Sequence, residues 1–177
     1  MIRSLNAENQ SALDGSLTQL LAGVHGGIDF WTVVCIGQIP PDPCAFVLKQ
    51  SERLESFLAE ARSLLLDGQT KLSDSNRQLL DSLGTSLKEF KDAFVLLARH
   101  RTVPVENVRT ATEALSSAYQ AIRETARELA EANGVRLSFW NSWTAERQQN
   151  YQGMLSTLFT EFCNNRTPKD IATHSTN

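Results

Sequence analysis

The densest group of cationic side chains comprises Arg99, His100, Arg101 and Arg109, at the turn between two expected long helices. Guanidinium groups bind phosphates and carboxylates, and the start of the following helix would add the positive end of its dipole. The functional interpretation is therefore an anion site in an enzyme or a sensor. The structural interpretation is that cations at the end of a helix stabilise its dipole by about 0.3–1 kcal/mol each. The sequence favours the structural interpretation.

Aromatic side chains form a second distinctive group, Phe30 and Trp31 in one segment and Phe139, Trp140 and Trp143 in another. Buried together, they would plug one end of a helical bundle, because each tryptophan covers about 150–250 Å². Exposed, they would anchor a partner, because tryptophan contributes strongly to protein interfaces. Residues 15–48 carry only two formal charges, which is a larger apolar region than an end plug requires. We therefore expect a surface for a partner or ligand here.

Motifs with a fixed catalytic or metal-binding spacing do not occur in the sequence. It contains no Glu-x-x-His, His-x-x-x-His, GxSxG, P-loop or GxGxxG pattern. The three histidines, His25, His100 and His174, lie far apart in the chain. We therefore expect no metal site and no cofactor. Because a site can assemble from distant residues, these absences favour a non-enzymatic function without excluding an enzyme.

The bulk composition is that of one ordinary globular domain. The chain has 177 residues, 41% of them hydrophobic, and a net charge of −3. This charge disfavours a nucleic-acid partner, which needs a basic face. The three cysteines form no CxxC pair and are odd in number, which favours a reducing compartment, and we expect the cytoplasm. The sequence has no run of about 18 uncharged apolar residues, so we expect no transmembrane helix.

Apolar residues recur every three or four positions in two consecutive segments, which is typical of helices that bury one narrow seam. The first seam comprises Leu80, Leu83, Leu87, Phe90, Phe94 and Leu97, and the second comprises Val108, Ala111, Leu115, Ala118, Ile122 and Leu129. The short connection between them makes the two helices antiparallel neighbours. The sequence thus predicts an all-α fold. We expect an up-and-down bundle of four main helices plus an N-terminal helical extension.

Start and stop signals predict where each helix lies. The main helices are expected at 43–67, 73–101, 104–132 and 144–164, and the N-terminal extension at 7–24. Gly26 and Gly27 are expected to end that first helix, Gly68 the second, and Asn133 with Gly134 the fourth. Residues 28–39 fit a helix or a strand, and we favour a short buried helix capped by Asp29. Residues 1–166 form one domain, and 167–177 are expected to be a disordered tail.

Three functions are compatible with these sequence features. The leading hypothesis is a non-catalytic interaction or scaffold module that binds a protein partner or a second copy of the chain through the aromatic and apolar surface. The alternative is a bundle that binds an apolar ligand or a membrane surface. The third is an enzyme or sensor that binds an anionic small molecule through the Arg99–Arg109 group.

Overall fold

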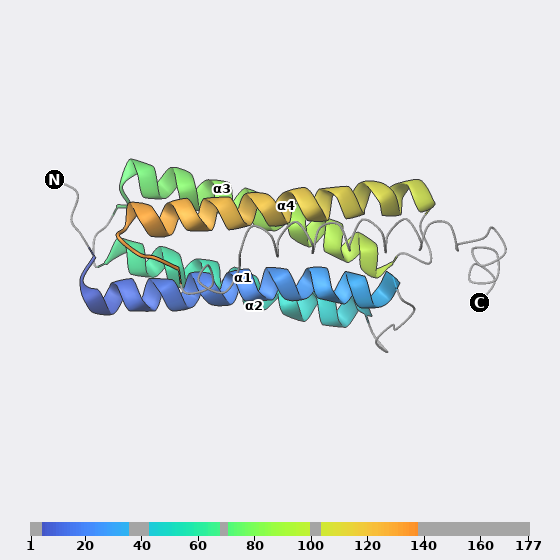
Figure 1. Cartoon of the computed structure of the whole chain (residues 1–177), viewed down its shortest axis with the longest axis horizontal. Coiled ribbons are helices and arrows are strands. Elements are labelled where there is room, and N and C mark those ends of the chain that lie inside the picture. Colours follow the sequence, from blue (N-terminus) through green and yellow to red (C-terminus); the bar gives the residue numbers. More distant parts are fainter. Residues whose placement is uncertain (1–4, 36–42, 68–70, 100–103, 138–177) are drawn as a thin grey trace.

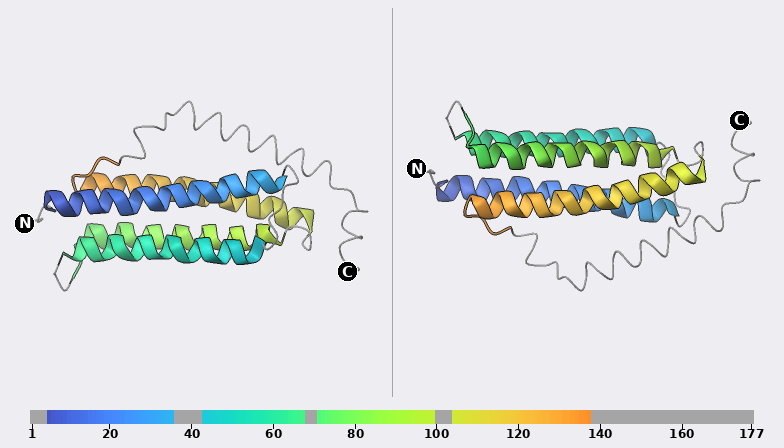
Figure 2. Two further views of the ribbon diagram at one scale, coloured as in Figure 1. Left: turned by 90° about the horizontal axis from the view of Figure 1, so that it is seen from below. Right: turned by 90° about the horizontal axis from the view of Figure 1, so that it is seen from above.

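The computed structural model describes residues 5–35, 43–67, 71–99 and 104–137, with the backbone alone described at 28–35, 43–46 and 105. Its four helices are α1 (Ala7–Cys35), α2 (Pro43–Leu66), α3 (Asp74–Ala98) and α4 (Val105–Ala132). They lie side by side and alternate in direction (Figure 1). Both α1 and α3 contact α2 and α4, so the helices form a closed ring. In Figure 2, α1 and α4 form one layer and α2 and α3 form the other. The predicted all-α bundle is confirmed.

The N-terminal helix is longer than predicted, because Gly26 and Gly27 do not end it. Helix α1 continues through both residues to Cys35. Gly27 is buried, and a Cβ atom placed there would lie 2.7 Å from Cζ of Phe90 on α3. The glycine therefore admits an aromatic ring into the core, and this packing outweighs a helix-propensity cost of about 1 kcal/mol. Asp29 lies inside the continuous helix, so its predicted role as a cap was wrong.

Helix α1 packs along the bundle as one of the four described helices, whereas we expected an extension beside four others. Its side chains Leu13, Leu17, Leu20, Leu21 and Val24 are fully buried. The first part of the ambiguous segment, 28–35, is helical as favoured, and 36–39 lie outside the described residues. The predicted helix at 144–164 and the tail at 167–177 also lie outside the described part of the chain.

The two predicted apolar seams face the core. All six residues of the seam on α3 and all six on α4 are buried. The rings of Phe90 and Phe94 lie 5.7 Å apart between centroids, in a tilted arrangement that suits aromatic pairs. The small buried side chains of Ala111 and Ala118 on α4 leave room for the large rings of Phe90 and Phe94 in the same core.

Capping residues define the helix ends. Ser73 is the N-cap of α3, and its Oγ accepts a hydrogen bond from the Asn76 amide at 3.2 Å. Helix α2 ends with Asp67 in the left-handed region at φ 43°, whereas the predicted Gly68 lies outside the described residues. Helix α4 ends as predicted, with Gly134 at φ 74°. The Val135 amide donates to the Ala130 carbonyl at 2.8 Å, which is the Schellman arrangement.

Amide side chains connect the helices at the end of the bundle where α1 begins. Asn76 and Asn133 exchange hydrogen bonds of 3.3 and 2.9 Å between α3 and the end of α4. Asn9 donates to Oδ1 of Asp67 at 2.9 Å and so joins α1 to the end of α2. These contacts fix the relative register of the helices, because each pair can form in only one alignment.

Candidate functional site

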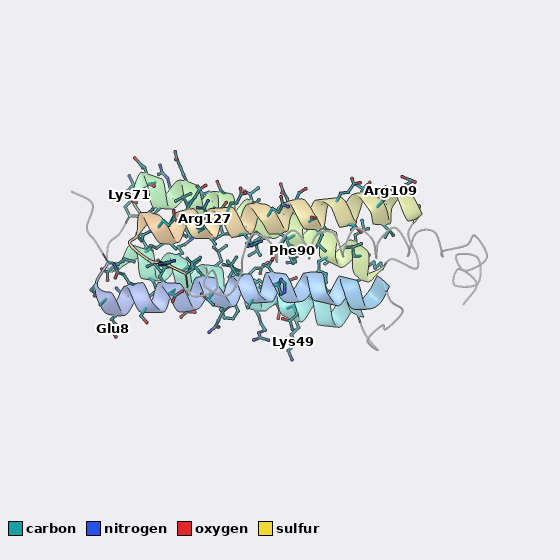
Figure 3. All side chains as sticks on the ribbon, viewed as in Figure 1. Glu8, Lys49, Lys71, Phe90, Arg109 and Arg127 are labelled. Carbon is teal, nitrogen blue, oxygen red and sulfur yellow. The ribbon has the colours of Figure 1, made fainter. Side chains whose placement is uncertain are left out.

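The predicted cationic group is only partly described. Arg99 is the exposed C-cap of α3, and its amide donates to the Leu96 carbonyl at 3.0 Å. Arg109 is exposed on α4 and lies 3.9 Å from the Glu106 carboxylate, with which it forms an ion pair (Figure 3). His100 and Arg101 lie outside the described residues. The anion site therefore stays a prediction, and its one fully described ion pair joins Arg109 to an acidic neighbour.

The predicted aromatic group is described even less. Phe30 and Trp31 belong to the last part of α1, where the structure describes the backbone. Phe139, Trp140 and Trp143 lie outside the described residues. Whether these five residues share one surface therefore stays a prediction.

The structure adds a buried polar cluster that the sequence patterns did not indicate. His25 Nδ1 on α1 lies 3.3 Å from the hydroxyl of Tyr119 on α4, and the Arg123 guanidinium lies 5.4 Å from the centroid of that ring. Arg123 is only 3% exposed, and this burial lowers the pKa of its guanidinium, an effect that the nearby tyrosine partly opposes. The four-residue spacing of Tyr119 and Arg123 could have indicated that they share one side of α4.

The outer face of α1 differs in charge from that of every other helix. Its exposed residues from position 11 to position 26 are Ser11, Gly15, Gln19, Ala22 and Gly26, none of which carries a charge. Asp14, the one charged residue in this stretch, is half-buried and accepts a hydrogen bond from Thr18 Oγ1 at 3.0 Å. The exposed faces of the other helices are charged: Lys49, Glu52, Arg53, Glu55, Glu60 and Arg62 on α2; Asp74, Arg77, Asp81, Lys88, Glu89 and Asp92 on α3; Glu106, Arg109, Glu113, Glu124, Glu128 and Glu131 on α4.

A groove of about 410 Å³ lies between α1 and α2, along the edge of this uncharged face. Its lining comprises Gln19, Ala22, Gly23, Gln50, Arg53, Leu54 and Phe57. The helices approach closely because Gly23 has no side chain, and a Cβ atom there would lie 2.5 Å from Cδ2 of Leu54. The floor is thus made of Gly23, Leu54 and Phe57. We call this hollow the α1–α2 groove.

Sequence reasoning could not identify the α1–α2 groove, although the composition indicated its neighbourhood. The low charge of residues 15–48 pointed to the N-terminal region. The contact between Gly23 and Leu54, however, joins residues that are 31 positions apart, and only the packing of antiparallel helices brings them together. The signal that could have helped was a glycine within an apolar helix segment, which suggests a close approach by a neighbouring element.

Other hollows are lined by described residues elsewhere on the bundle. One, of about 340 Å³, is lined by α2 residues, including Leu58, Ala59 and Leu66. Another, of about 520 Å³, lies at the end of α4, where Val135 and Leu137 fold back beside Arg127. Among the described residues, no group of three histidine, cysteine or acidic side chains could hold a metal ion. Nor is any helix in the described ranges both long enough and apolar enough to cross a membrane.

Comparison with known proteins found no family model, no curated protein and no solved structure that matches this chain.

Proposed function

We propose that this protein is a non-catalytic interaction module that binds another protein through its N-terminal region, in a reducing cytoplasm. The observation that supports the proposal is the uncharged outer face of α1, from Ser11 to Gly26, on a bundle whose other helices have charged outer faces. The centres of protein interfaces are depleted in charged side chains, because an unpaired charge is costly to remove from water.

Folding of the described chain does not require small residues at the exposed glycine positions of α1. A Cβ atom at Gly15 or Gly26 would meet no atom of the described residues within 4 Å. Each of these glycines costs the helix about 1 kcal/mol relative to alanine. Glycine at these positions would allow the backbone of another element to approach α1 closely, because a side chain would block that approach. Such a contact would account for the loss of helix stability.

The aromatic residues extend the same proposal towards the end of α1. Phe30 and Trp31 follow Gly26 by four and five residues on one continuous helix, so the uncharged face and the aromatic pair belong to a single element. We propose that these two side chains, with Phe139, Trp140 and Trp143, add apolar contact area to the interface. Their contribution is tested separately from that of the uncharged face.

The experiment places a charge on the uncharged face and measures partner binding. A photoreactive amino acid at Ala22 should cross-link a defined partner in cells of the source organism, and the same group at the exposed Ser82 on α3 should not. With the photoreactive group placed at Ser11 instead, the same partner should be captured. Adding Ala22→Glu should abolish that capture, whereas adding Ser82→Glu should leave it intact. Equal cross-linking from Ala22 and Ser82 would contradict the proposal.

The variant Trp31→Ala tests the aromatic part. If the variant keeps its melting temperature but no longer binds the partner, Trp31 contacts the partner. If the variant unfolds and its remaining folded fraction still binds the partner, Trp31 is a core residue.

The alternative function, binding of an apolar ligand or a membrane surface, predicts flotation of the purified protein with liposomes. If the protein floats with liposomes and both Ala22→Glu and Trp31→Ala abolish this flotation, the membrane-binding function would be favoured over the protein-binding proposal.

A further inference from the structure

Two cations one helical turn apart lie on the rim of the α1–α2 groove. Arg53 lines the groove, and Lys49 lies one helical turn earlier on the same side of α2. Both are exposed, and neither forms an ion pair in the part of the chain that the structure describes. Figure 3 shows the Lys49 side chain pointing away from the bundle into solvent.

Most other cations of α2 and α3 have acidic partners, and Lys88 is the exception among the described residues. Arg62 pairs with Asp81 at 3.7 Å and Lys91 with Glu55 at 3.1 Å, both across the contact between α2 and α3. Two like charges four residues apart on one helix repel each other slightly, so Lys49 and Arg53 do not support the helix that carries them. The opposite wall of the groove, on α1, offers no acidic side chain, because its residues are Gln19, Ala22 and Gly23.

The shape of the groove limits what can bind there. From Gln50 to Phe57, α2 rises about 10 Å, which is the length of two helical turns. The floor is apolar, and the amides of Gln19 and Gln50 can donate and accept hydrogen bonds at the edges. A helix laid along this floor would place its apolar side chains against Gly23, Leu54 and Phe57. Acidic residues one turn apart would then face Lys49 and Arg53.

From this charge complementarity we infer that the α1–α2 groove binds an acidic amphipathic helix of a partner protein. The inference rests on the proposed function, since it names the chemistry of the partner for the same face. A nucleic acid fits less well, because two cations neutralise few phosphates. Glu52 and Glu55 are exposed on α2 but do not line the groove, so a single helix seated there avoids them, whereas a broad anionic membrane would meet both carboxylates.

The test uses the full chain and two synthetic peptides of 16 residues that share one apolar face of leucine and alanine. One carries glutamate beside that face and the other carries lysine. The glutamate peptide should bind and shift the NMR signals of Gln19, Gly23, Gln50 and Leu54, and the lysine peptide should not bind. The double variant Lys49→Glu, Arg53→Glu should bind the glutamate peptide about tenfold more weakly than the unchanged protein does. The same variant should bind the lysine peptide.

A matched control reverses the charge of two other exposed lysines, Lys71 before α3 and Lys88 on α3, in the double variant Lys71→Glu, Lys88→Glu. Neither lysine forms an ion pair among the described residues. This variant changes the net charge equally but leaves the groove intact, so the affinity for the glutamate peptide should change less than twofold. Equal binding of the two peptides, shifts confined to another face, or no binding of the glutamate peptide up to about 1 mM would overturn the inference. So would stronger binding to vesicles of anionic lipid than to the peptide.

Failure of this inference can be told apart from failure of the proposed function. If the cross-linker at Ala22 captures a defined partner and the Lys49→Glu, Arg53→Glu variant captures it equally well, the interaction module stands and the acidic partner falls. If Ala22 and Ser82 capture the same proteins, the proposed function itself falls.

Discussion

Gly26 and Gly27 are neighbours in one helix, and the structure predicts opposite effects when each is replaced by alanine. At Gly26 an added Cβ atom meets no described atom within 4 Å, so Gly26→Ala should gain the difference in helix propensity, about 1 kcal/mol. At Gly27 the Cβ atom would lie 2.7 Å from Cζ and 3.1 Å from Cε1 of Phe90, and 3.4 Å from Cε1 of Phe94. Both rings are buried, so they have little room to move.

The expected magnitude follows from these two terms. Overpacking a core typically costs about 1–3 kcal/mol, so Gly27→Ala should lower the free energy of unfolding by about 0–2 kcal/mol after the propensity gain is subtracted. The two variants should therefore differ by about 1–3 kcal/mol in the free energy of unfolding. For a chain of this size, each kcal/mol corresponds to about 2–4 °C in melting temperature.

Urea unfolding followed by far-UV circular dichroism measures this difference directly. Gly27→Ala should cost less free energy of unfolding when it is added to Phe90→Leu than when it is made in the unchanged protein. The smaller leucine side chain leaves room for the new methyl group. Equal stabilisation by Gly26→Ala and Gly27→Ala would refute the reasoning, because it would mean that Gly27 does not face Phe90. The register of α1 against α3 would then be wrong.

Three further substitutions test other contacts by equilibrium unfolding. Gly134→Ala should lose about 1 kcal/mol, because φ is 74° there and left-handed backbone is costly for a residue with a Cβ atom. Ser73→Ala should lose about 1 kcal/mol with its capping hydrogen bond, whereas Ser75→Ala, inside the first turn, should change stability by less than half as much. Tyr119→Phe should lose about 1 kcal/mol, because it removes a hydroxyl that contacts His25 and hydrogen-bonds to Arg123; an unchanged stability would show that these contacts contribute nothing.

The apolar seams could be predicted from sequence because helix periodicity alone determines which side of a rod is apolar. The seam residues can be assigned to the core without knowledge of the partner helix, both between Leu80 and Leu97 and between Val108 and Leu129. Periodicity does not determine where a helix ends. A glycine is an equally good signal for a stop and for a close contact, and only the position of Phe90 decides between them at Gly27.

The groove was beyond sequence reasoning for a related reason. Its walls come from two helices whose alignment depends on contacts such as that of Asn9 with Asp67. Composition could show that the N-terminal region is poor in charge, but it could not place Arg53 beside Gly23. The predicted anion site and the aromatic surface include residues outside the described ranges, so their geometry remains a prediction for experiment.

The glycines of α1 connect the fold to the proposed function. Gly23 and Gly27 face Leu54 and Phe90, so contacts within the chain account for both. A Cβ atom at Gly15 or Gly26 would meet no described atom within 4 Å, yet these glycines weaken the helix by about 1 kcal/mol each. If no other backbone approached this face, alanine, lysine or glutamate at these positions would give a more stable helix. On the proposed function, the outer glycines serve a contact that the described part of the chain does not make, and the uncharged surface around them is where such a contact would form at least cost.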